Sequence, residues 1–70
     1  PEPPAVASLT AREREVIALV IDGADNRGVA QRLGISPRTV EVHKARVMLK
    51  LGARNIADLM RLHHRFDGLA

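Results

Sequence analysis

The sequence contains no cysteine, and Phe66 is the only aromatic residue among its 70 residues. Without thiols the chain can form neither a disulfide framework nor a thiolate metal site, and the absence of cysteine fits a cytoplasmic protein. No apolar run approaches the roughly 18 residues of a membrane span, and the first residues lack the basic-then-apolar order of a signal peptide. These absences argue against a disulfide-rich secreted protein and predict no contact with a membrane.

Residues suited to catalysis or metal binding are also scarce. The chain has no pairing of a nucleophile with a base and no glycine-rich phosphate loop, and it is too small to enclose a substrate pocket. His63 and His64 are adjacent, so they face different ways on a helix, and no carboxylate completes a ligand set with them or with His43. We therefore expect no enzymatic activity, no metal and no cofactor.

Positive charge is concentrated in one stretch of the chain. The net charge is +3, but five cations face the single acidic residue Glu41 between residues 36 and 54. A basic helix on an otherwise near-neutral domain is typical of modules that bind polyanions. Charge alone is explained more simply by a basic helix that is merely solvated. Polyanion binding therefore needs support from a motif.

The signals at helix ends predict an all-α fold, a compact four-helix helix-turn-helix domain. Thr10 and Glu13 have the spacing of a capping box, which begins a helix over about residues 11–22. The run from Arg12 to Glu15 is expected to be a solvated first turn with weak local ion pairs. A short second helix over about residues 26–33 follows, capped by Asp25 or Asn26. Gly28 costs about 1 kcal/mol relative to Ala inside a helix and predicts a loose first turn there.

The best-defined motif is the turn that leads into the third helix, over about residues 37–51. Gly34 can adopt the positive φ of the corner, while Ala30, Ile35 and Val40 have the spacing that packs two helices at an angle. Ser36 and Pro37 mark the start of the third helix as its N-cap and first residue. This arrangement predicts a helix-turn-helix.

The third helix has an unusual outward face. At about 100° per residue, Val40, Val47 and Leu51 fall on the core side, with Lys44 and Met48 beside them. The opposite side carries short and aliphatic residues framed by cations instead of the usual Lys and Glu. A face of this kind can enter the major groove of DNA, where small apolar groups meet thymine methyls. Its members are Arg38, Glu41, Val42, Ala45 and Leu49, with Arg46 at the flank.

A fourth helix is expected over about residues 55–66, after Gly52 ends the third. Its inward face carries Ile56, Leu59, Met60, His63 and Phe66, and a second stripe carries Ala57, Arg61 and His64. We assign residues 1–8 to a proline-rich linker, residues 9–67 to the domain, and residues 68–70 to a tail.

Taken together, these residues resemble the DNA-binding domain of LuxR/FixJ-type (NarL-like) transcription regulators. The resemblance covers most of the chain and implies a bacterial, cytoplasmic response regulator of a two-component system whose upstream receiver domain is outside this sequence. It also implies binding to double-stranded DNA at inverted half-sites as a homodimer formed by the fourth helix, with RNA polymerase as a further candidate partner. The matching residues are Leu9-Thr10, Arg12 to Val16, Gly23, Asn26, Ala30, Leu33, Ile35-Ser36, Thr39-Val40, His43 and Lys50-Leu51.

The motif and the resemblance assign roles to particular side chains. Base contacts are expected from Arg38, Glu41, Val42, Lys44 and Ala45, and phosphate contacts from Thr39, His43, Arg46, Lys50 and Arg54. Dimerisation is expected through Ala57, Arg61 and His64. The sequence departs from the family pattern in two ways. Gly28 replaces a common acidic residue, and Glu41 and Ala45 stand where NarL-like members carry base-reading lysines.

Two other functions remain open at this point. A sigma-factor region reads promoter DNA through a similar motif, although Lys50-Leu51 followed by an amphipathic fourth helix argues against it. A protein-interaction module would instead bury the aliphatic strip of the third helix against another helix. Salt dependence separates groove binding from a protein interface, because only contact with phosphates releases many counterions.

Overall fold

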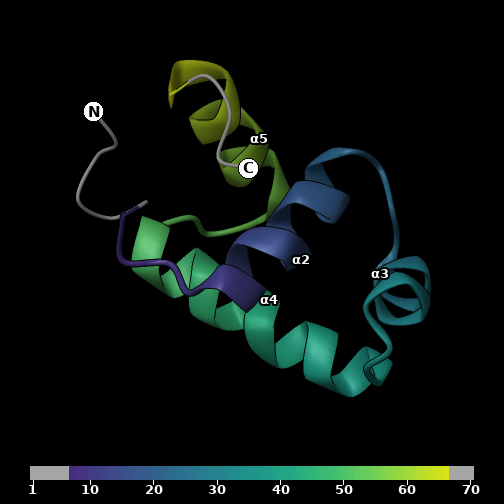
Figure 1. The fold of residues 1–70 in the computed structure, drawn as a ribbon. Helices are drawn as coiled ribbons and strands as arrows, with labels where there is room; N and C mark the ends of the chain where they lie inside the picture. Colours follow the sequence, from purple (N-terminus) through teal and green to yellow (C-terminus); the bar gives the residue numbers. More distant parts are fainter. Residues whose placement is uncertain (1–6, 67–70) are drawn as a thin grey trace.

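The computed structural model describes the backbone of residues 7–66 and the side chains of residues 7–62. Within that range there are four helices and no strand, which confirms the all-α prediction. Figure 1 shows α4, the predicted third helix, crossing α2, with α3 beside the N-terminal end of α4 and α5 on the side away from α3. The helices are α2 (Ala11–Ile21), α3 (Asn26–Leu33), α4 (Pro37–Leu51) and α5 (Ile56–Phe66).

Side-chain caps set the helix starts, as the sequence predicts. The Thr10 hydroxyl accepts the backbone N–H of Glu13 at 3.1 Å, and the Glu13 carboxylate accepts the N–H of Thr10 at 2.9 Å, which completes the capping box. Ser36 caps α4 by accepting the N–H of Thr39 at 3.1 Å. Asn55 accepts the N–H of Asp58 at 2.9 Å, so it precedes α5 as a cap, one residue from the predicted start.

The first turn of α3 is not loose, so that prediction is wrong. Asp25 is the cap, and its carboxylate accepts the N–H of Gly28 at 2.8 Å. A Cβ added at Gly28 would come within 3.2 Å of the same carboxylate oxygen. Glycine therefore leaves room for the cap, which offsets its low intrinsic helix propensity.

The turn between α3 and α4 depends on Gly34. Its φ of +68° lies in the left-handed region, which side chains other than glycine adopt at a cost. The next N–H, from Ile35, bonds back to the carbonyl of Ala30 at 3.1 Å and closes the end of α3. The positive φ of Gly34, this hydrogen bond and the Ser36 cap together set the angle at which α4 leaves the turn.

The interior consists of two clusters of aliphatic side chains, and α4 contributes to both. Val47 packs with Leu9, Ile17 and Leu59, while Val40 packs with a second group that contains Val16, Val29 and Ala30. Val40 and Val47 are fully buried, as their spacing predicts. The interior thus contacts α4 at two positions along its length, and α5 contributes Leu59 to the cluster around Val47.

Two sequence predictions about exposure are wrong. Periodicity predicts Ile56 on the inward face of its helix, but it is 40% exposed because it lies in the first turn of α5, at the edge of that stripe. The charge run predicts Glu13 in a solvated turn, but the residue is only 2% exposed because it faces α4. The side chains of His63, His64 and Phe66 lie outside the described part of the structure.

Candidate nucleic-acid interface

The outward face of α4 is exposed, as predicted. Val42 is 41% exposed, and Glu41 and Ala45 are also exposed, whereas Val40 on the opposite side is fully buried. An exposed aliphatic side chain between small or charged neighbours matches the surface that a major groove accepts. Contact between this face and bases remains a prediction.

Cations without an ionic partner flank this face. Arg38 in the first turn and Arg46 further along are both exposed, and neither forms an ion pair with another described residue. Thr39, a predicted phosphate contact, has its hydroxyl 2.9 Å from that of Ser36, which places both at the N-terminal end of α4. The free N–H groups of that end favour an anion.

Lys44 connects α4 to the start of α3. Its ammonium donates to the side-chain carbonyl of Asn26 at 2.9 Å, and the residue is half-buried. Because Asn26 is neutral and is the first residue of α3, the positive charge of Lys44 stays uncompensated next to the positive end of a helix dipole. This pairing was not anticipated from sequence, and it leaves Lys44 available to an anion.

Lys50 is in a different situation, because it has a carboxylate partner. Its ammonium donates to Glu13 at 2.7 Å and to the backbone carbonyl of Ser8 at 3.1 Å. The hydrogen bond from Lys50, followed by the backbone N–H of Thr10, lowers the pKa of the Glu13 carboxyl below its ordinary value. The predicted phosphate contact of Lys50 is untested, but its charge is already neutralised within the domain.

Asp58 brings together Arg54 and Arg61, two arginines with different predicted roles. One carboxylate oxygen accepts the backbone N–H and the Nε–H of Arg54, each at 3.0 Å, and the other accepts from Arg61. These bonds, those from Arg54 foremost, hold the pKa of Asp58 well below its ordinary range, and the same carboxylate raises the pKa of Arg54. The spacings of three and four residues could have indicated both pairs.

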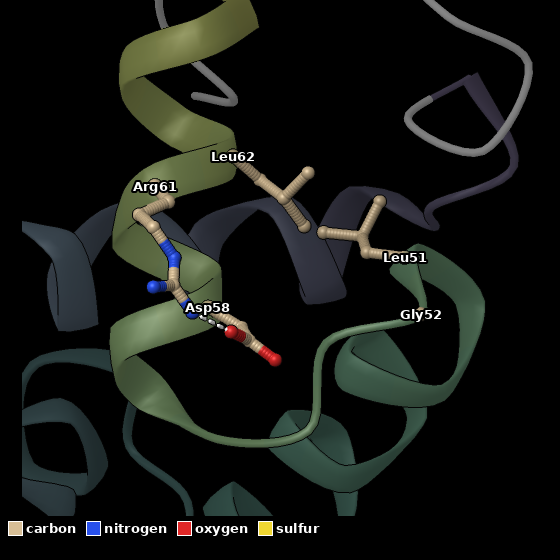
Figure 2. A pocket seen from close by; sticks show the side chains of 5 residues that line it. All are labelled: Leu51, Gly52, Asp58, Arg61 and Leu62. Carbon is tan, nitrogen blue, oxygen red and sulfur yellow. Dashed lines mark hydrogen bonds and ion pairs between the residues drawn. The ribbon is translucent and has the colours of Figure 1, made fainter.

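A pocket of about 250 Å³ lies where the end of α4 meets α5. Figure 2 shows Leu51 and Leu62 pointing toward each other across it, with the Asp58–Arg61 pair on its α5 side. Arg61 and the exposed Ala57 are two of the predicted dimer contacts. The third, His64, has its side chain outside the described range.

His43, a predicted phosphate contact, is half-buried on α4. Its Nδ1 is buried and has no hydrogen-bond partner among the described residues. Its contact with DNA stays a prediction.

The Glu13–Lys50 pair was missed because its members are 37 residues apart in sequence. No local periodicity connects them, and Glu13 already had a sufficient explanation as the reciprocal member of a capping box. The only hint in the sequence was that Lys50 is adjacent to Leu51, which was predicted on the core side of the same helix.

We predict that Glu13→Gln makes stability less sensitive to acid. The folded-state pKa of Glu13 lies below the unfolded value of about 4.3, so its contribution is complete above that value and is lost as pH falls through the folded pKa. Because a single proton is involved, the free energy of unfolding can change by at most about 1.4 kcal/mol per pH unit. Urea unfolding between about pH 5 and pH 3 measures it, and Glu15→Gln, in an exposed pair with Arg12, is the control. Identical pH dependence in the Glu13 variant and the unaltered chain would contradict the prediction.

Among residues 7–62, no group of three or more His, Cys, Asp or Glu side chains could hold a metal ion. None of the helices in the described range is both long and apolar enough to cross a membrane.

Comparison with protein families gives a match over most of the chain. A model described as "Bacterial regulatory proteins, luxR family" matches residues 7–63. This range contains α2, α3 and α4 together with most of α5.

Individual relatives agree with that match. The C4-dicarboxylate transport transcriptional regulatory protein DctR of Rhodobacter capsulatus is 62% identical over 50 residues, covering 71% of this chain and 25% of that protein. The tetrathionate response regulatory protein TtrR of Salmonella typhimurium is 48% identical over 62 residues, covering 89% of this chain and 29% of that protein. The chain thus spans about a quarter to a third of the relatives' length.

A solved structure is similar in fold as well as in sequence. The crystal structure of full-length FixJ from B. japonicum superposes with a TM-score of 0.83 at 44% identity, covering 90% of this chain and 31% of that one. The arrangement of four helices described above is therefore shared with part of a longer regulatory protein.

Proposed function

This chain belongs to the luxR family of bacterial regulatory proteins, and on that basis we propose that it is the double-stranded DNA-binding output domain of a two-component transcription regulator. The observation that carries the proposal is the exposed outward face of α4, with Val42 at its centre and unpaired Arg38 and Arg46 at its edges. Val40 and Val47, which are fully buried, hold the other side of α4 against the interior, so the outward face is free to enter a major groove.

In the proposed complex, the outward face of α4 reads bases. Val42 and Ala45 contact thymine methyls, Arg38 or Lys44 reaches guanine, and Glu41 accepts from cytosine or rejects unfavourable sequences. Phosphate contacts come from Thr39, His43, Arg46 and Arg54. Asp58 supports this role of Arg54, since it orients the guanidinium through Nε and leaves the terminal nitrogens available.

The same proposal includes the oligomeric state, the partners and the cellular location of the domain. Two copies bind inverted half-sites and meet through α5, at Ala57, Arg61 and His64. A receiver domain upstream controls the output domain, RNA polymerase is a further partner, and the protein acts in the bacterial cytoplasm. No reaction is catalysed, in agreement with relatives that are named as transcriptional regulators.

The sigma-factor alternative does not agree with the family to which the chain belongs. A protein-interaction module remains the second candidate, because Leu49 on α4 is 84% exposed. Selection of bound duplexes from a random pool tests the proposal directly. Enrichment of a common sequence supports it, whereas failure to retain any duplex in dilute buffer would refute it.

We predict that Val42→Ala lowers the affinity for a selected duplex by about fivefold, since one base-pair contact is worth about 1 kcal/mol or more. Affinity for a scrambled duplex should change by less than about twofold, because phosphate contacts are kept. Fluorescence anisotropy measures both constants, and Leu49→Ala, on the same face but two turns further along α4, is the control. A uniform loss on both duplexes would count against direct reading of bases by Val42.

A further inference from the structure

A buried ion pair joins the first turn of α2 to the far end of α4. Glu13 is 2% exposed, yet it lies in the first turn of α2, where a charged side chain normally reaches water. A buried carboxylate is costly unless it is paired and hydrogen-bonded. Glu13 meets both conditions through Lys50 at 2.7 Å and the N–H of Thr10 at 2.9 Å.

We propose that the Glu13–Lys50 pair positions α4 for DNA recognition, and that Lys50 makes no phosphate contact. This inference rests on the proposed DNA-binding function and deepens it. In it, Glu13 and Lys50 are positioning residues, which act on DNA only through the orientation of the outward face of α4.

The two ends of α4 are held in different ways. Helix α4 has 15 residues, so it is roughly 22 Å long, and its first turn is fixed by the Ser36 cap. Val47 and Leu51 pack its far end against the interior, but contacts between aliphatic side chains are not directional. The ion pair adds a directional bond to a carboxylate that Thr10 already holds in place, so rotation of α4 about its own axis would cost Lys50 its partner.

Rotation of α4 about its axis would change which side chains face the DNA. Successive residues are about 100° apart around a helix, so a modest rotation changes which side chains face the groove. Val42 and Ala45 would then be displaced from the bases that they meet. Phosphate contacts through long, flexible Arg and Lys side chains would tolerate the same rotation, so sequence discrimination should be affected more than general affinity.

Lys50 differs from the other cations of α4 in the partner that it binds. Lys44 bonds only to the neutral Asn26 side chain, and Arg46 has no ionic partner among the described residues, so both keep their full charge. Lys50 pairs with a carboxylate that becomes an unpaired buried charge if the lysine leaves. Phosphate binding by Lys50 would thus require Glu13 to lose its partner.

The test compares Lys50→Met and the double variant Glu13→Gln/Lys50→Met with Arg46→Met, which removes an unpaired cation one turn earlier. The double variant leaves no buried charge, so it keeps the test valid if the single variant unfolds. Circular dichroism establishes folding, and affinities for a selected duplex and for a scrambled duplex are measured across a range of salt concentrations.

We expect the salt slope on the scrambled duplex to be unchanged in the Lys50 variants and to shrink by about 0.9 in Arg46→Met. The ratio of selected to scrambled affinity should fall about tenfold in the folded Lys50 variants. A slope reduced by about 0.9 in the double variant, or an unchanged ratio, would overturn the inference while leaving the proposed function intact. If the unaltered chain binds no duplex, the proposed function fails, and the inference fails with it.

Discussion

Raising the salt concentration from about 50 to 200 mM is expected to weaken binding of one domain to duplex DNA by roughly 150-fold. The estimate assumes that each cation without a buried carboxylate partner neutralises one phosphate, whether or not it also reaches a base; these cations are Arg38, Lys44, Arg46 and Arg54. Each neutralised phosphate contributes about −0.9 to the slope of log K against log salt, which gives about −3.6. A fifth contact from Lys50 would steepen the slope to about −4.5 and the loss to roughly 500-fold.

Variants locate the source of this dependence. Lys44→Met should reduce the slope to about −2.7, while Arg12→Met, which removes a cation paired with Glu15 on α2, should leave it unchanged. Anisotropy titrations at several salt concentrations provide the slopes. A slope near zero for the unaltered chain would instead favour a protein-interaction module.

Leu59→Ala is expected to lower the free energy of unfolding by about 3 kcal/mol. Leu59 is fully buried against Leu9, Ile17 and Val47, so its truncation removes aliphatic surface and leaves a cavity in that cluster. A domain of 70 residues is stable by only about 3.5–10 kcal/mol, so the loss is a large part of the total. Because Leu59 is the fully buried residue of α5 in the described range, its truncation should also loosen the helix proposed to form the dimer.

Urea unfolding monitored by circular dichroism measures this loss. The matched control is Ile56→Ala in the same helix, which should cost less than about 1 kcal/mol because Ile56 is 40% exposed. Equal losses in the two variants would show that Leu59 does not anchor α5.

The sequence predicted the helices well because each begins or ends at a residue with a local physical role. Thr10, Ser36 and Gly34 act within three or four residues of themselves, so their effect is visible without a structure. The burial of Val40 and Val47 on α4 was predicted from the 3.6-residue period in the same way. The prediction of a helix-turn-helix rested on these short-range signals.

The errors share a different cause. Periodicity gives the direction of an apolar stripe but not its width, so it could not place Ile56 at the edge of the interior. The burial of Glu13 depends on Lys50, and their proximity depends on how α2 and α4 cross. A pairing that depends on tertiary packing leaves no pattern in a single sequence. For this reason the sequence could not distinguish Lys50, which has a carboxylate partner, from Lys44, which has none.

The position of Asp58 between Arg54 and Arg61 has a consequence for how two copies could approach each other. A bare Arg61 beside its symmetry mate would repel it, but here the guanidinium already shares a carboxylate. Each cluster of one carboxylate and two guanidiniums keeps a net charge of +1, but Arg61 meets its mate as one half of an ion pair, so the unbalanced charge is that of Arg54. Binding of Arg54 to a phosphate would neutralise that charge, so attachment to DNA would favour self-association through α5.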